Sequence, residues 1–220
     1  KQQLDSLTHT CFQVTPYESY ITLAERLNAL LPGDFAKKSL FFSAGGEAVE
    51  NAIKIARYYT KRPALITFTN GYHGRSYMGM ALSARMIPFK QGFGPFPSDI
   101  YRLPFPDDFH GISLEDTKRA FDTLFRSDCP PDQIAAIFFE PVQGEGGYNI
   151  ATPEFVEYLR DLCDAHGIVL VADEIQSGMG RTGKMFAMEH FGIHPDLSCI
   201  GKSIGGGLPI SGVVGRADII

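Results

Sequence analysis

The chain has 220 residues, of which 44% are hydrophobic and 20% are charged, and its formal net charge is −5. This composition is typical of a globular protein and argues against an intrinsically disordered one, while the dispersed basic residues argue against nucleic-acid binding. No apolar run approaches the ~20 residues of a membrane span, and the four scattered cysteines lack the spacing of metal ligands. We therefore expect a cytoplasmic protein without a membrane segment or a metal site.

The first third of the chain predicts two helices and two strands. Apolar residues at helical spacing predict a helix over 21–31 that ends at Pro32-Gly33, so residues 1–34 are interpreted as a helical lead-in. A short apolar run at 40–42 precedes a glycine-rich turn, and helical spacing resumes at Glu47. A strand is predicted over 64–68, followed by a polar loop.

The remaining elements alternate between helices and strands. Residues 86–111 are rich in proline and lack periodicity, which predicts a long irregular segment with a functional or interface role. Thr152-Pro153 is typical of a helix start, because proline is favoured at the first helical position. The predicted elements after residue 111 are helices over 114–125 and 153–166 and strands over 134–139, 168–172, 197–200 and 211–214.

This alternation of helices with continuously apolar strands predicts an α/β fold, a mainly parallel sheet with helices on both faces. In such sheets ligands bind at the carboxyl ends of the strands. Five conspicuous residues fall at or just beyond the predicted strand ends, namely Gly45, Tyr72, Glu140, Asp173 and Lys202. We therefore expect them to share one site.

Lys202 and Asp173 together suggest a specific cofactor chemistry. An amine and a carboxylate at neighbouring strand ends can hold a pyridine aldehyde, with the lysine as Schiff base and the aspartate keeping the ring nitrogen protonated. Gln176 lies three positions after Asp173 and could reach the phenolic oxygen of such a ring. The alternatives are a surface lysine and a carboxylate paired with a structural arginine.

Three further segments carry candidate binding residues. Gly45 and Gly46 join a predicted strand to a helix, where free amides suit a phosphate, although the spacing is not that of a nucleotide-binding P-loop. Tyr72 could stack on a cofactor ring and Arg75 could bind a substrate carboxylate, or both could belong to an ordinary surface loop. Glu140 and Glu145 follow the next strand, and such a pair of carboxylates could bind a metal, act as acid and base on a glycosidic bond or form a charge gate. No histidine lies at ligand spacing from them, which argues against a transition metal.

Taken in order, these segments resemble the class III, or ω-amino acid, aminotransferases that depend on pyridoxal phosphate, and most closely the bacterial 4-aminobutyrate aminotransferases among them. The resemblance spans nearly all of the chain. It rests on residues 43–54 (SAGGEAVENAIK), 72–75 (YHGR), 140–147 (EPVQGEGG), 172–183 (ADEIQSGMGRTG) and 201–209 (GKSIGGGLP).

The resemblance implies the large, cofactor-binding domain of fold type I over residues 1–220, without the carboxy-terminal small domain. Its implied cofactor is pyridoxal 5′-phosphate. Lys202 would hold it covalently and move a proton, and Asp173 would pair with its ring nitrogen. The other implied contacts are Ile175 and Tyr72 on the two ring faces with His73 alongside, Gln176 at the phenolic oxygen, and the amides of Gly45 and Gly46 at the phosphate. Gly46 stands where the family usually has serine or threonine.

For substrates, the resemblance implies that Arg75 binds the distal carboxylate. Glu145 would be a gate that masks a second arginine of the carboxy-terminal domain. The implied reaction moves the amine of an ω-amino acid, 4-aminobutyrate first, to 2-oxoglutarate and gives succinate semialdehyde and glutamate. A homodimer or higher homo-oligomer is expected. The alternatives are another class III enzyme acting on ornithine, acetylornithine or 5-aminovalerate, a decarboxylase or aminomutase, and a non-catalytic remnant that binds the cofactor.

Overall fold

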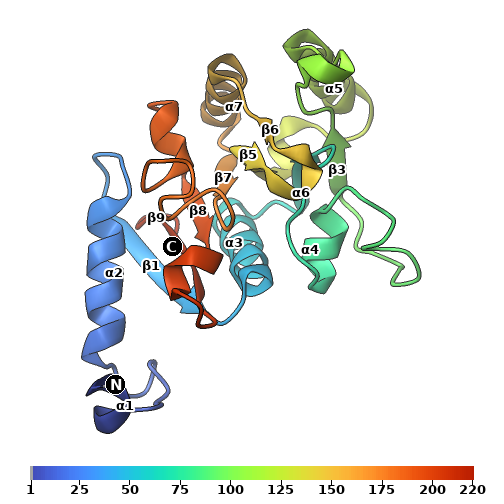
Figure 1. Cartoon of the computed structure of the whole chain (residues 1–220). Coiled ribbons are helices and arrows are strands. Elements are labelled where there is room, and N and C mark those ends of the chain that lie inside the picture. The colour runs from blue at the N-terminus through green and yellow to red at the C-terminus, as the bar shows by residue number, and fades with distance from the viewer. Residues whose placement is uncertain (1) are drawn as a thin grey trace.

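The structure is a computed structural model that describes residues 2–220, and a seven-stranded sheet runs through its centre (Figure 1). The strands lie in the order β1-β9-β8-β7-β4-β2-β3. Their bounds are β1 Lys37–Phe42, β2 Ala64–Phe68, β3 Ile100–Leu103, β4 Ile134–Phe139, β7 Val169–Asp173, β8 Leu197–Ile200 and β9 Ser211–Arg216. Two short strands, β5 Val142–Gln143 and β6 Asn149–Ile150, form a separate antiparallel pair.

The sheet is mainly parallel, which confirms the fold class expected from the sequence. Strands β3, β2, β4, β7 and β8 pair in parallel, and only β9 runs against its neighbours β8 and β1. Strands β2, β4, β7 and β8 are fully buried. Burial on both faces is the reason that they appear in the sequence as continuous apolar runs.

The four helices predicted from the sequence are present; two begin at the predicted residue, and two begin two or three residues earlier. Their bounds are α1 Gln2–Ser6, α2 Glu18–Leu30, α3 Gly45–Thr60, α4 Tyr77–Leu82, α5 Leu114–Ser127, α6 Gly144–Gly147 and α7 Pro153–His166, with short 3-10 turns η1 Asp108–His110, η2 Pro131–Gln133, η3 Ala187–His190 and η4 Lys202–Gly205. At the start of α7, the Thr152 hydroxyl accepts a hydrogen bond from the Phe155 amide at 3.3 Å. None of the helices found in residues 2–220 is both long and apolar enough for a membrane span.

One face of the sheet is covered by α3. Its buried stripe is spaced at three and four residues and consists of Ala48, Val49, Ala52, Ile53 and Ala56. These side chains pack against strand residues such as Phe138, Val171 and Val213. Small alanines allow the helix to lie close to the strands, and this positions its amino-terminal end beside the carboxyl edge of the sheet.

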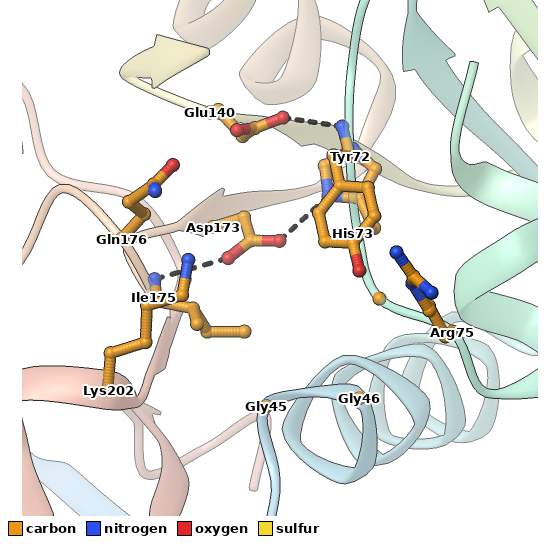
Figure 2. Close-up of a pocket in the computed structure, with 11 residues that line it drawn as sticks. Gly45, Gly46, Tyr72, His73, Arg75, Glu140, Asp173, Ile175, Gln176 and Lys202 are labelled. Atoms are coloured by element: carbon orange, nitrogen blue, oxygen red, sulfur yellow. Dashed lines mark hydrogen bonds and ion pairs between the residues drawn. The ribbon is translucent and has the colours of Figure 1, made fainter. Parts of the chain in front are cut away.

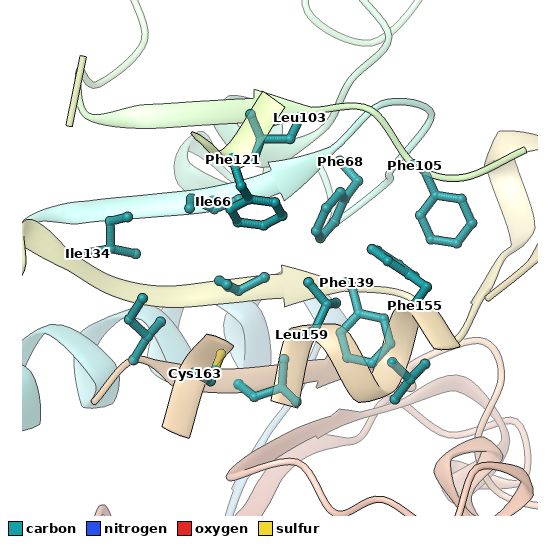
Figure 3. Packing of buried hydrophobic residues seen from close by; sticks show 14 of the residues in the cluster. Ile66, Phe68, Leu103, Phe105, Phe121, Ile134, Phe139, Phe155, Leu159 and Cys163 are labelled. Carbon is teal, nitrogen blue, oxygen red and sulfur yellow. The ribbon is translucent and has the colours of Figure 1, made fainter. Parts of the chain in front are cut away.

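The opposite face carries α5 and α7 around an aromatic core (Figure 3). The Phe155 ring of α7 is fully buried and meets Phe68 and Phe105 edge-on, with ring centroids 5.2 Å and 5.1 Å away. Helix α2 covers the β1–β9 end of the sheet, where Leu27 and the following Leu31 pack with residues such as Ile200 and Val214. The sheet therefore forms the middle of three layers.

The prediction that residues 86–111 are irregular throughout was wrong. Residues 100–103 form β3, which pairs in parallel with β2 at the edge of the sheet. The strand is too short and too little buried to produce a clear alternation. The neighbouring helix α4 was also missed, because it has six residues and its last carbonyl groups depend on tertiary contacts. The Arg102 guanidinium donates to the carbonyl oxygens of Ala81 and Ser83 at 3.0 and 2.9 Å.

Candidate active site

The carboxyl ends of the central strands enclose a cavity of about 370 Å³ (Figure 2). Nine of the ten site residues predicted from the sequence line it, and the tenth, Glu145, does not. The lining residues are Gly45, Gly46, Tyr72, His73, Gly74, Arg75, Glu140, Asp173, Ile175, Gln176 and Lys202. They lie at the ends of β1, β2, β4, β7 and β8 or in the segments that follow, so the sheet brings together residues that are far apart in the chain.

The amino-terminal end of α3 forms an anion cradle on one side of the cavity. The Glu47 carboxylate turns back and accepts hydrogen bonds from the amides of Ser43 and Ala44, at 2.8 and 3.0 Å. The next two amides, those of Gly45 and Gly46, have no acceptor anywhere in residues 2–220. Free amides at the start of a 16-residue helix suit a phosphate group.

Two close approaches explain the glycines of this cradle. A Cβ atom on Gly45 would lie 3.1 Å from the Ile175 side chain, and one on Gly46 would lie 3.3 Å from the Ser76 hydroxyl. The Ser76 hydroxyl is itself buried and lacks a hydrogen-bond partner within the described part of the chain. Bare amides and an unsatisfied hydroxyl beside them fit a phosphate-bearing cofactor.

Asp173 lies at the end of β7 with both carboxylate oxygens held. Its Oδ2 bonds the Nδ1 atom of His73 at 2.8 Å, and its Oδ1 accepts from the Ile175 amide at 3.2 Å. His73 is anchored in turn, by Thr67 Oγ1 at 3.1 Å from its Nε2 and by Ser83 Oγ, which accepts from its amide at 2.9 Å. The His73 ring therefore supports the Asp173 carboxylate through this contact. The resemblance had placed the ring alongside Tyr72, beside the cofactor.

The electrostatics of this pair favour a charged His73. Burial by itself lowers the pKa of His73, but the hydrogen bond and negative charge of Asp173 outweigh it, and the net effect is a raised pKa. A histidine that holds its proton more strongly also keeps its partner carboxylate oriented. Asp173 is 4% exposed and faces the cavity, where it can pair with a protonated ring nitrogen.

Glu140 is a site residue that the sequence reasoning noted at a strand end but assigned no role. Its Oε1 accepts from the Tyr72 amide at 2.6 Å and its Oε2 from the Gly144 amide at 3.3 Å. Burial raises the pKa of Glu140 to about 7; the charge of His73 lowers this pKa, and the charge of Asp173 raises it further. Through its two hydrogen bonds, Glu140 fixes the loop that carries Tyr72.

Lys202 begins the turn η4 with a backbone φ of 46°, a conformation that non-glycine residues rarely adopt. Its side chain extends toward Asp173 and Ile175 (Figure 2). A second hollow of about 380 Å³ shares Lys202 and Gln176 with the main cavity and is lined in addition by residues including Ser177, Arg181 and Thr182. Lys202 therefore lines both hollows.

Arg75 and Glu145 differ in their relation to the cavity. The Arg75 guanidinium is exposed at the cavity and forms no ion pair with any carboxylate of residues 2–220, so it can receive one from a ligand. Glu145 is exposed on α6 and is absent from the residues that line either hollow. The described part of the chain contains no cluster of three or more metal-ligating side chains.

Comparisons with known proteins agree with this geometry. The family model described as Aminotransferase class-III matches residues 1–220. The chain is 51% identical over 218 residues to the 5-aminovalerate aminotransferase of Pseudomonas putida and, equally, to the 4-aminobutyrate aminotransferase of Escherichia coli; each alignment covers 99% of this chain and 51% of the relative. The chain spans about half the length of these curated relatives.

Solved structures of transaminases share the fold. A transaminase from the marine bacterium Virgibacillus superposes with a TM-score of 0.91 at 29% identity, over 99% of this chain and 50% of that one. An amine transaminase from an uncultivated Pseudomonas species, solved in its PLP-bound form, superposes with a TM-score of 0.87 at 29% identity, over 99% of this chain and 52% of that one.

Proposed function

Because the chain belongs to the class III aminotransferases, we propose that it forms the cofactor-binding part of an enzyme that transfers the amine of an ω-amino acid to 2-oxoglutarate. The supporting observation is the cavity in which Lys202, Asp173 and the free amides of α3 converge. The first proposed amino donor is 4-aminobutyrate, with succinate semialdehyde and glutamate as products. A second is 5-aminovalerate, since a relative of equal identity carries that name.

The residues fit pyridoxal 5′-phosphate as the cofactor. The Gly45 and Gly46 amides would hold its phosphate, Asp173 its ring nitrogen, Gln176 its phenolic oxygen, and Tyr72 and Ile175 the two faces of its ring. When bound, this cofactor supplies an electron sink that stabilises negative charge on the carbon beside the substrate nitrogen. His73 keeps Asp173 oriented through the 2.8 Å contact.

The Lys202 amine would anchor the cofactor and then take up and return the proton at the substrate carbon that carries the amine. Its place supports both tasks, because Lys202 lines the main cavity with Asp173 and also lines the second hollow.

Arg75 is the proposed receptor for the distal carboxylate of the substrate, since its guanidinium faces the cavity without a carboxylate partner in residues 2–220. The proposed gate role of Glu145 rests on the family resemblance and on its place in α6, next to Gly144 at the second hollow. A homodimer in the cytoplasm is the proposed assembly and location, and light scattering of the purified protein tests the dimer.

The direct test is visible absorption of the protein with pyridoxal phosphate. It is made on the longest reading frame that contains this sequence, because the chain spans about half of its relatives. We expect a bound-cofactor band that 4-aminobutyrate abolishes and 2-oxoglutarate restores. Lys202→Ala should lose both changes, and Lys54→Ala, on the exposed side of α3, should retain them. A stable band that responds to no ω-amino acid would refute the proposal.

A further inference from the structure

Arg75 reaches the cavity supported by a ring from another segment. The Cζ atom of Arg75 lies 4.7 Å from the centroid of the Phe89 ring. Apart from this cation–π contact, the Arg75 guanidinium is exposed and forms no hydrogen bond or ion pair within residues 2–220. Phe89 belongs to residues 86–111, the segment for which the sequence predicted a functional or interface role.

The same ring also contacts Tyr72. The centroids of Phe89 and Tyr72 are 5.2 Å apart, with the ring planes inclined at 62°. One phenyl ring therefore touches both residues that flank His73 and Gly74 in the loop after β2. In Figure 2, Tyr72 and Arg75 lie on the side of the cavity away from Lys202. Phe89 thus connects the proposed ring-stacking residue with the proposed carboxylate receptor.

The turn that carries Phe89 is anchored by hydrogen bonds. The adjacent Lys90 is 7% exposed, and its ammonium group donates to the Ser83 carbonyl oxygen at 3.0 Å. The Lys90 amide closes a turn onto the Met86 carbonyl oxygen at 2.7 Å. Ser83 also accepts from the His73 amide at 2.9 Å. The turn that presents Phe89 and the histidine that holds Asp173 therefore share one anchor.

Stacking on an aromatic ring holds the arginine guanidinium in one orientation. It occupies the flat face of the guanidinium and leaves the N–H donors at its edge free for a bidentate bond to a carboxylate. An unsupported arginine must lose side-chain freedom when it binds. Phe89 removes part of that cost in advance.

We propose that Phe89 is a positioning residue for the carboxylate subsite, which holds Arg75 and Tyr72 in place and thereby sets the preference for amino donors with a distal carboxylate. The part of this inference that concerns amino donors rests on the proposed function. The contact with Arg75 does not, so the two can be tested separately.

The test compares Phe89→Leu, Phe89→Tyr and Phe93→Leu in the longest reading frame, loaded with pyridoxal phosphate. Phe93 lies in the same segment, is 59% exposed and makes none of these contacts, so it is the matched control. For Phe89→Leu we expect the KM for 4-aminobutyrate to rise about two- to fivefold, the size of a cation–π contact, with kcat nearly unchanged. Phe89→Tyr, which keeps an aromatic face, should have a KM close to that of wild type, and Phe93→Leu should leave the KM unchanged.

A double-mutant cycle and a binding measurement make the outcome decisive. In an Arg75→Ala background, Phe89→Leu should have no further effect on KM; an unchanged fold-increase there would overturn the proposal.

Calorimetric titration with butyrate, a carboxylate without the amine, should show about two- to fivefold weaker binding for Phe89→Leu than for wild type. If this weakening occurs while the wild type turns over no ω-amino acid, the proposed function fails and the positioning role stands. If 4-aminobutyrate turnover is normal and Phe89→Leu alters neither KM nor butyrate binding, the positioning role fails.

Discussion

Glu174, the residue after Asp173, is expected to make the stability of the protein depend on pH. Its side chain is fully buried, and its carboxylate accepts hydrogen bonds from the amides of Ala187 and Met188 at 2.5 and 3.1 Å. These bonds tie the end of β7 to η3 and hold the intervening glycine-rich loop. Burial raises the pKa of Glu174 to about 7, although the two amides oppose this effect.

The sign of the effect follows from proton binding. Between the ordinary pKa of 4.5 and the folded value of about 7, the folded protein keeps a proton on Glu174 that the unfolded chain has released. The stabilisation is therefore complete below the unfolded pKa, and the free energy of unfolding falls as the pH rises through the folded pKa. The total is about 3 kcal/mol, of which about 2 kcal/mol is lost between roughly pH 5.5 and pH 8.5.

Urea unfolding at these two pH values measures the effect. Glu174→Gln cannot ionise, so about 2 kcal/mol of the pH-dependent loss should disappear. The variant should also be less stable at the lower pH by about 1–3 kcal/mol, because its amide places a donor against one of the two backbone N–H groups. Glu157→Gln, on the exposed side of α7, controls for removal of a negative charge. If Glu174→Gln loses stability with pH as steeply as wild type, the reasoning is refuted.

Two further substitutions test the core and the site. Phe155→Ala removes a ring that packs edge-on against Phe68 and Phe105 and should cost about 3–5 kcal/mol in urea unfolding; a cost below about 1 kcal/mol would mean that the aromatic cluster contributes little. Gly144→Ala would place a Cβ atom 1.4 Å from Oε1 of Gln176, so the amide must move away. We expect about fivefold weaker binding of pyridoxal phosphate, equivalent to one lost hydrogen bond, in spectrophotometric titration, and unaltered affinity would contradict this placement of Gln176.

Much of the fold and of the cavity was predictable because the relevant signals are local. Continuous apolar runs identified the buried strands β2, β4, β7 and β8. Parallel strands place their carboxyl ends at one edge of a sheet, so residues next to those ends, such as Asp173 and Lys202, could be assigned to one site without coordinates. Strand β3 was missed because an edge strand of four residues depends on its neighbour β2 for its hydrogen bonds.

The sequence by itself determined the layered α/β architecture, the family and nine of the eleven residues that line the cavity. The tertiary structure alone decided how those residues are held: the ring of Phe89 on Arg75, the shared anchor at Ser83, the contact of His73 with Asp173, and the position of Glu145 outside the cavity. The physical reason is that a local sequence pattern shows which face of a helix or strand is buried and which is exposed. Which partner it meets depends on how segments that are distant in the chain pack against each other.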